Sequence, residues 1–281
     1  MSQVYCGSQS LLGIEAIIFD KDGTLADSAP FLKRLAQTRS QRCVDAILAN
    51  GRGEVSWPAN TKDTLAGFPI TYQPQPFPSD LVDQLLATLG VWENRIDPDG
   101  LMAAGTRQSN IDALVEVLLG IGVSSQSAKS EIQTLVAEQF VLADGDLSPK
   151  TIYTPPFPGT QAMLQRFSQS KIKLGVLSSD SPANIEDFLR HYDLLAWIDD
   201  WQGTEPGDIP KPNPALLHRL CNRMAVSPRQ VVIVGDSWVD QALAQQAETA
   251  GFISVSEAWG RPPVAGSDLI LHRWEDLKIG S

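Results

Sequence analysis

Three short apolar runs, far apart along the chain, place the strongest constraint on its fold. They cover residues 16–19, 172–177 and 231–234, and each is followed by small or polar residues. Apolar runs of this length are typical of strands that are buried on both faces of a parallel sheet. The segments 251–256 and 268–272 are weaker candidates for further strands. We therefore predict one sheet built from both ends of the sequence.

Helical patterns alternate with these runs in the second half of the chain. The segments with helical spacing of apolar residues are 160–169, 182–191, 214–224 and 240–250. Strands that alternate with helices predict an α/β layer whose strands run parallel. The predicted fold class is therefore α/β, with a Rossmann-like parallel sheet as its core.

The region between the first and second apolar runs has a different pattern, which is mostly helical. The apolar face of a first helix is predicted to consist of Leu32, Leu35, Ala36, Cys43 and Ile47. Residues 110–120 and 130–143 predict two more helices, whereas the prolines within 67–80 predict a loop. This region therefore predicts an inserted, mostly helical domain.

The length of the chain agrees with two domains. It has 281 residues, which is long for one ordinary domain and sufficient for two of moderate size. The proline-rich segment 151–159 is interpreted as the linker that returns to the sheet. We predict a core domain of residues 1–28 and 156–281 and an inserted domain of residues 29–155.

Charged and hydroxyl side chains follow the ends of the predicted strands, where ligands bind in open α/β sheets. These side chains are Asp20, Asp22, Ser178, Asp236 and Asp240, and Lys211 lies in the segment KPNP before the third run. Alternate residues of an extended chain point the same way, so Asp20 and Asp22 can reach one pocket with Lys21 between them. We expect these residues to meet at one edge of the sheet.

Several carboxylates in one place are unfavourable unless a cation joins them. Mg²⁺ is a hard cation that takes oxygen ligands and commonly keeps waters and a phosphate oxygen in its coordination shell. We expect the side chains of Asp20 and Asp236 and the backbone carbonyl of Asp22 to bind Mg²⁺. Asp240 is expected to orient the outer coordination shell.

Four segments in this order resemble the motifs of the haloacid dehalogenase superfamily of phosphatases and phosphotransferases. They are FDKDGTLADS, VLSSD, KPNP and VVIVGDSWVD, and the resemblance covers roughly residues 14–28 and 157–270. The position of the insertion is similar to that of the branch whose mobile helical cap lies between the first two motifs. Within that branch, the chain looks most like the phosphoglycolate-phosphatase-like members.

The resemblance implies phosphoryl transfer in two steps through an aspartyl-phosphate on Asp20. Asp22 is then the general acid and base, Ser178 donates to a phosphoryl oxygen, and Lys211 offsets negative charge. Backbone amides near Gly23 and Ser179 would supply further donors to phosphate. The presence of Asp22 argues against dehalogenation, because true dehalogenases replace this second acid.

Arg107 is the candidate for a substrate contact from the cap, because a cationic side chain on a cap loop can reach a second anionic group of the substrate. A surface arginine at a helix start is the alternative interpretation. The reaction that we expect is Mg²⁺-dependent hydrolysis of a small phosphomonoester, with phosphoglycolate among the candidates. A phosphosugar mutase of the β-phosphoglucomutase type and a non-catalytic binding protein remain alternatives.

Bulk properties limit the partners and the cellular location. The formal net charge of −11 argues against broad binding to nucleic acid or to anionic membranes. The three cysteines are few and far apart, which fits a reducing cytosol better than a set of disulfides. No apolar stretch is long enough to span a bilayer or to serve as a signal peptide. We therefore expect a cytoplasmic enzyme that acts on a small molecule, whose oligomeric state the sequence leaves open.

Overall fold

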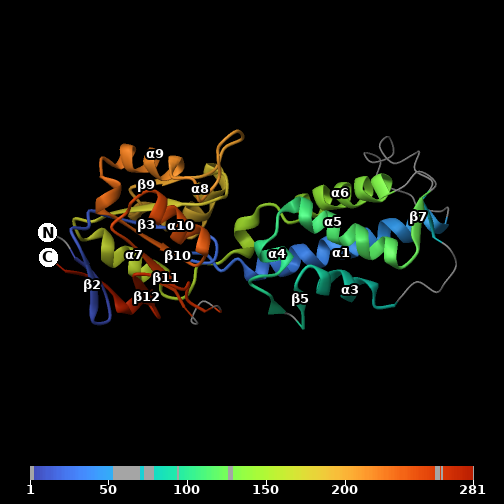
Figure 1. Cartoon of the computed structure of the whole chain (residues 1–281), viewed down its shortest axis with the longest axis horizontal. Coiled ribbons are helices and arrows are strands. Elements are labelled where there is room, and N and C mark those ends of the chain that lie inside the picture. Colours follow the sequence, from blue (N-terminus) through green and yellow to red (C-terminus); the bar gives the residue numbers. More distant parts are fainter. Residues whose placement is uncertain are drawn as a thin grey trace. The chain divides into compact units, whose positions relative to one another are not determined.

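The structure is a computed structural model that describes residues 3–52, 70–72, 79–93, 95–125, 129–256, 260 and 262–280. The chain forms two compact units (Figure 1). The core unit contains Met1–Ser28 and Lys150–Ser281, and the inserted unit contains Ala29–Pro149. The chain thus returns to the core at Lys150, earlier than the predicted residue 156, so residues 150–155 belong to the core.

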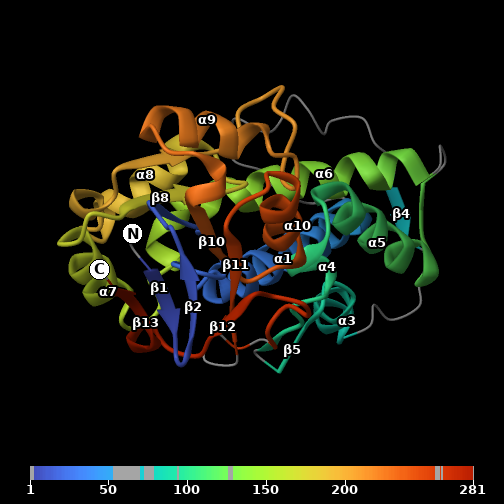
Figure 2. The same cartoon turned by 60° about the vertical axis from the view of Figure 1, so that its left-hand side comes forward.

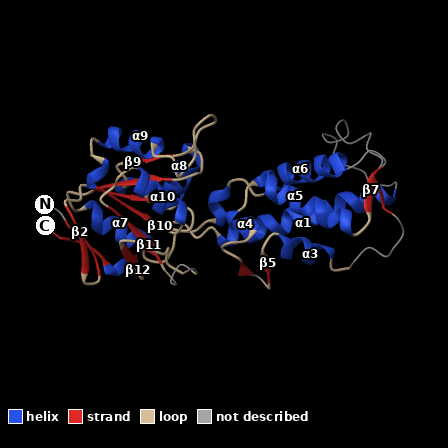
Figure 3. Cartoon of the chain, in the orientation of Figure 1, coloured by secondary structure: helices blue, strands red, loops and turns tan. Residues whose placement is uncertain are grey.

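A sheet of six parallel strands forms the centre of the core unit (Figure 3). Its order is β12 (Leu269–Leu271), β11 (Gly251–Val255), β10 (Val231–Gly235), β3 (Ala16–Phe19), β8 (Lys173–Leu177) and β9 (Asp200–Gln202). The five predicted strands are confirmed, and the α/β class with them. The sequence analysis missed β9, because this three-residue strand contains Asp200 and Gln202 and so lacks an apolar run.

Helices cover both faces of this sheet, which explains the uninterrupted apolar strands. Ile17 and Phe19 of β3 pack with α7 (Thr160–Ser168) and α8 (Pro182–His191). Ala16 and Ile18 point to the other face, which packs with α9 (Ala215–Met224) and α10 (Trp238–Gln246). Figure 2 shows α10 beside β10 and β11. Both residue sets of β3 are therefore buried, although neighbouring side chains point in opposite directions.

A small antiparallel sheet joins the two ends of the chain within the core unit. Its order is β13 (Leu277–Gly280), β1 (Gln3–Cys6) and β2 (Gln9–Leu12). The described part of this unit also contains short 3₁₀ turns at Lys150–Tyr153, Leu195–Trp197, Pro228–Gln230 and Trp274–Asp276. The sequence analysis did not predict this sheet, because β2 exposes most of its side chains and carries no pattern of burial.

The inserted unit is mostly helical, as predicted. Among its described residues, the helices are α1 (Ala29–Arg52), α3 (Leu81–Thr88), α4 (Leu101–Ala104), α5 (Arg107–Gly120) and α6 (Lys129–Asp146). Two short antiparallel ladders pair β4 (Ile70–Tyr72) with β7 (Val123–Ser125) and β5 (Val91–Trp92) with β6 (Arg95–Ile96). Within the predicted loop 67–80, residues 70–72 therefore form a strand, while 67–69 and 73–78 lie outside the described residues.

The predicted apolar face of α1 forms part of the core of the inserted unit. Leu35, Ala36, Cys43 and Ile47 are buried, and Leu32 is half-buried. This face packs against α3 and α6, as the helical periodicity predicts. In the part of the chain that the structure describes, no helix has the length and apolar character that a membrane span requires.

Candidate active site

The middle of the large sheet brings together three strand ends that carry polar side chains. Asp20 follows β3, Ser178 follows β8 and Asp236 follows β10, and these three strands are neighbours in the sheet. After β3 the chain builds β8 and β9 on one side, and only then β10, β11 and β12 on the other. The reversal beside β3 is a topological switch point, where open α/β sheets hold their ligands beyond the carboxyl ends of the strands.

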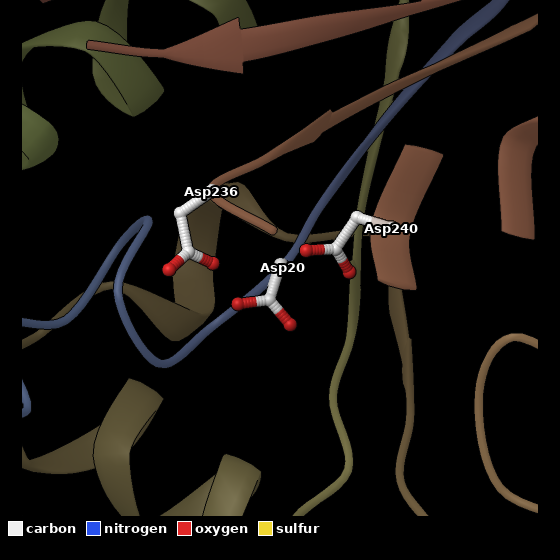
Figure 4. A group of neighbouring side chains, drawn as sticks. All are labelled: Asp20, Asp236 and Asp240. Atoms are coloured by element: carbon white, nitrogen blue, oxygen red, sulfur yellow. The ribbon is translucent and has the colours of Figure 1, made fainter. Parts of the chain in front are cut away.

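Three buried aspartates meet at this switch point. Asp20, Asp236 and Asp240 each offer a carboxylate oxygen, and these oxygens all lie within 4.8 Å of one another (Figure 4). Asp240 comes from the first turn of α10, which begins after the helix cap Ser237. We call these three residues the acid cluster. The structure thus unites the side chains predicted as metal ligands, apart from Asp22, whose backbone carbonyl was the predicted ligand.

Lys211 compensates part of this negative charge. Its Nζ donates to Oδ1 of Asp20 at 2.7 Å and to Oδ1 of Asp240 at 2.9 Å, and its side chain is almost completely buried. Burial by itself would lower the pKa of Lys211, but the two carboxylates outweigh it and raise the pKa. Burial raises the pKa of Asp20, against the effect of Lys211, and Asp240 and Asp236 raise it further. Lys211 therefore bridges two of the three carboxylates in the acid cluster.

The acid cluster fits a hard divalent cation. Three carboxylates converge on one point, and their oxygens are the ligand type that Mg²⁺ prefers. Asp240 is held by protein partners at both oxygens, since Oδ2 accepts from Ser237 Oγ at 2.6 Å while Oδ1 accepts from Lys211. This arrangement agrees with an outer-shell position for Asp240 and leaves Asp20 and Asp236 as the candidate direct ligands.

Position 23 requires glycine, because its backbone lies too close to the Asp236 side chain for any larger residue. Its φ is +87°, and a Cβ at this position would lie 2.3 Å from Oδ2 of Asp236. Its own N–H donates to the carbonyl of Ala26 at 2.8 Å. This bond speaks against the predicted contact of the Gly23 amide with phosphate, because the amide already has a partner in the turn. Gly23 instead makes room for the acid cluster.

Asp22 lies outside the acid cluster and is held by two lysines. Its Oδ2 is 3.0 Å from Lys150 Nζ and 2.9 Å from Lys21 Nζ. Both lysines also contact Oδ2 of Asp180, at 2.8 Å from Lys150 and 2.7 Å from Lys21. The sequence analysis assigned no role to Lys21, Lys150 or Asp180. Only Asp180 carried a signal, because it ends the segment VLSSD.

The two serines after β8 differ in their surroundings. Ser178 is buried, and its Oγ accepts from the amide of Asp180 at 3.1 Å. A hydroxyl that accepts one bond keeps its own O–H as a donor. Ser179 is exposed. The location of Ser178 beside Asp20 at the ends of adjacent strands agrees with the predicted phosphate contact.

Arg107 belongs to the inserted unit and begins α5. Thr106 caps this helix, since its Oγ1 accepts from the amide of Ser109 at 3.0 Å. The Arg107 side chain pairs with Asp144 at 2.9 Å, and Asp144 also pairs with the buried Arg39 at 2.8 Å. Arg107 is thus a half-exposed residue at a helix start, where it is paired with Asp144. Its contact with a substrate stays a prediction.

Comparisons with known proteins place this chain in a family. The sequence model of a family described as haloacid dehalogenase-like hydrolase matches residues 14–248. A phosphoglycolate phosphatase of Synechococcus elongatus is 35% identical over 104 residues, which cover 37% of this chain and 46% of that protein. The chain thus spans about half the length of this curated relative. A phosphoglycolate phosphatase of Photobacterium profundum is 23% identical over 269 residues, which cover 94% of each protein.

A solved structure has the same fold. The crystal structure of a predicted phosphoglycolate phosphatase from Haemophilus somnus 129pt aligns with a TM-score of 0.57 and 18% sequence identity. The alignment covers 94% of this chain and 96% of that one. The shared architecture therefore includes the inserted unit as well as the parallel sheet.

Proposed function

Since the chain belongs to the haloacid dehalogenase-like hydrolase family, as its motifs predicted, we propose that it hydrolyses a small phosphomonoester in the presence of Mg²⁺. The observation that carries this proposal is the contact of the buried Lys211 with both Asp20 and Asp240 at the switch point of the sheet. This contact links the third motif to the first and the fourth. It supports the proposal because a fixed positive charge beside a carboxylate nucleophile would stabilise the transferring phosphoryl group.

Asp20 is the nucleophile in this proposal. Lys211 holds Oδ1 of Asp20, so the other carboxylate oxygen is the one that attacks phosphorus. The new Asp20–phosphorus bond forms as the bond from phosphorus to the alcohol oxygen breaks. Water then cleaves the aspartyl-phosphate and releases inorganic phosphate. Lys211 remains in place as a point charge throughout both steps.

Asp22 is the proposed general acid and base. In the first step it gives a proton to the departing alcohol, and in the second it takes one from the attacking water. Ser178 donates its hydroxyl proton to a phosphoryl oxygen, and the backbone at Ser179 provides a further donor. Mg²⁺ held by Asp20 and Asp236, with the Asp22 carbonyl, would supply positive charge to the phosphoryl oxygens.

Phosphoglycolate is the first substrate to test, because the curated relatives carry the name phosphoglycolate phosphatase. A second anionic group on that molecule would suit a cationic contact, and Arg107 is the proposed residue for it. The experiment is to measure phosphate release from phosphoglycolate, sugar phosphates and nucleoside monophosphates, with MgCl₂ and with EDTA. We expect turnover of at least one ester with MgCl₂ and none with EDTA.

Two variants make this experiment specific. Asp20→Asn should abolish turnover, because an amide cannot form the acyl phosphate. Asp193→Asn is the matched control, since Asp193 is exposed and its φ of +55° suits asparagine equally well. Turnover that persists in Asp20→Asn would disprove the assignment of the nucleophile. If the product is an isomerised sugar phosphate and no free phosphate is released, the protein is a mutase instead. If no ester is turned over and the protein does not bind Mg²⁺, it is a non-catalytic protein.

A further inference from the structure

The core unit holds a second group of charged side chains beside the acid cluster. This group, the two-lysine cluster, consists of Lys21, Asp22, Lys150 and Asp180. Each of its lysines contacts both of its aspartates, at distances between 2.7 and 3.0 Å. The positive and negative charges therefore alternate around a closed ring, in which each ammonium group lies between two carboxylates.

The two lysines differ in how deeply they are placed. The Lys21 side chain is 2% exposed and its Nζ lies 5.6 Å from the centre of the Phe188 ring, so it is part of the interior. The Lys150 side chain is 24% exposed and comes from the 3₁₀ turn at Lys150–Tyr153. A change at Lys150 leaves the buried Lys21 paired with Asp180, so it can test the cluster without leaving a buried charge alone.

The two oxygens of Asp22 have different surroundings as a result. Oδ2 receives both ammonium groups, whereas Oδ1 is buried and has no hydrogen-bond partner among the described residues. A buried oxygen without a partner is unfavourable. Such an atom is expected where a ligand supplies the missing partner.

We infer that Lys150 is a positioning residue for Asp22: it holds Oδ2 and thereby sets the orientation in which the carboxyl group exchanges a proton with the reacting groups. This inference rests on the proposed hydrolase function. The carboxyl proton of Asp22 moves to the alcohol oxygen as the phosphorus–oxygen bond of the ester breaks and the Asp20–phosphorus bond forms. In the second step a proton of the attacking water moves to the Asp22 carboxylate, the Asp20–phosphorus bond breaks, and phosphate leaves. Lys150 keeps its protons in both steps.

Leaving groups of different basicity test this role. An alkyl phosphate releases a basic alkoxide that needs a proton in the transition state, whereas 4-nitrophenyl phosphate releases a stable phenolate that does not. We expect Lys150→Met to lower kcat/KM about 10²-fold for the alkyl ester that the wild type hydrolyses best. The loss for 4-nitrophenyl phosphate should be only a few-fold. The ratio kcat/KM reports the steps up to departure of the alcohol, which include the protonation.

Two further variants separate positioning from general disruption. Lys150→Arg keeps a cation on Oδ2 and should restore most of the activity on the alkyl ester. Tyr192→Phe removes the bond from the Tyr192 hydroxyl to the carbonyl of Thr151, which anchors the same 3₁₀ turn at 3.0 Å. Because Tyr192→Phe leaves the ammonium group in place, it should not change the preference between the two esters.

The outcomes distinguish this inference from the function on which it rests. If the wild type hydrolyses neither ester, the proposed function fails and the role of Lys150 fails with it. If the wild type is active and Lys150→Met lowers the activity on both esters equally, or lowers neither, only the positioning role is overturned. The same conclusion follows if Tyr192→Phe reproduces the selective loss.

Discussion

Lys211 Nζ lies 2.7 Å from Oδ1 of Asp20, although 191 positions separate the two residues in the sequence. The lysine reaches this point from the segment before α9, and the aspartate is fixed at the end of β3. Asp240 takes a second hydrogen bond from the same ammonium group. The ammonium group of Lys211 therefore stabilises two buried carboxylates in the fold, in addition to the role toward phosphate that we propose for it.

Replacing Lys211 by methionine should weaken both the fold and the activity. Lys211→Met leaves Asp20 and Asp240 buried without their cation, and the loss of one partner of a buried pair lowers stability by about 3–5 kcal/mol. Urea unfolding in EDTA measures this loss. MgCl₂ should recover part of it, because a cation that binds only the folded state stabilises that state. Turnover should fall at least about 10²-fold.

Lys171→Met is the matched control for this change. Lys171 is exposed in the same unit, so its replacement should alter the free energy of unfolding by no more than about 0.5 kcal/mol. If Lys211→Met unfolds at the wild-type urea concentration in EDTA, the ammonium group does not stabilise the acid cluster, and the basis of the site is wrong.

An alanine at position 23 should disturb the acid cluster directly. The φ of +87° is unfavourable for alanine by about 1–2 kcal/mol, and its Cβ would meet Oδ2 of Asp236 at 2.3 Å. Asp236 must then move, so Gly23→Ala should lose Mg²⁺-dependent turnover as well as stability. The unfolding temperature of the variant and of the wild type is measured at increasing concentrations of MgCl₂. A smaller rise in the variant shows the loss of cation binding.

Gly13→Ala separates the two effects of that change. Gly13 also has a positive φ, +73°, but a Cβ there would have no neighbour within 4 Å. This variant should show the backbone destabilisation with normal turnover and a normal response to MgCl₂. Equal activity of the two alanine variants would mean that the space beside Asp236 is not required.

The three cysteines should be unreactive in the folded protein. Cys6, Cys43 and Cys221 are free and buried. Burial raises the pKa of Cys43 to about 12 and that of Cys221 to about 11, and burial together with Asp276 raises the pKa of Cys6 to about 12. The reactive thiolate is therefore scarce at neutral pH. Ellman's reagent should detect no thiol in the native protein and three in guanidinium chloride.

An exposed thiol calibrates this measurement. Ser168 is exposed, so Ser168→Cys should react at once and add one thiol to the native count. Prompt reaction of a thiol in the unsubstituted protein would mean that at least one cysteine reaches solvent through an opening of the structure.

The sequence analysis located the centre of the sheet and its acids because both leave strong local signals. The strands β3 and β10 are continuous apolar runs, and β8 is apolar after Lys173, as is typical of strands that are buried on both faces. Asp20, Ser178 and Asp236 follow these runs directly. Their meeting in space then follows from the parallel order of the strands, since parallel strands end at the same edge of a sheet.

Other parts depend on contacts that the local sequence does not encode. Lys150 meets Asp22 across 128 positions, and nothing near Lys150 distinguishes it from a solvated lysine. The start of α10 was predicted at Asp240, but Ser237 caps the helix and Trp238 begins it. The sequence predicted that the Gly23 amide donates to phosphate. The positive φ of Gly23 and the hydrogen bond of its amide to Ala26, which argue against that contact, become visible only in three dimensions.

The ionisation of Asp180 should make the stability of the protein depend on pH. Burial alone would raise the pKa of Asp180, but Lys21 and Lys150 outweigh it and hold the pKa well below its usual value. The folded state therefore favours the carboxylate more than the unfolded state does. The resulting stabilisation is present above the unfolded pKa of about 4 and is lost as the pH falls toward the lower folded value.

Asp180→Asn removes this contribution, since asparagine cannot ionise. At neutral pH the variant should be less stable than the wild type by about 3 kcal/mol, because two lysines, one of them buried, lose a shared anionic partner. The difference should shrink below about pH 4, where the unfolded wild type also takes up a proton. Urea unfolding of both proteins between neutral and acidic pH measures this trend, with Asp193→Asn as the exposed control. A difference that stays constant with pH would show that the aspartate contributes through its shape and not through its charge.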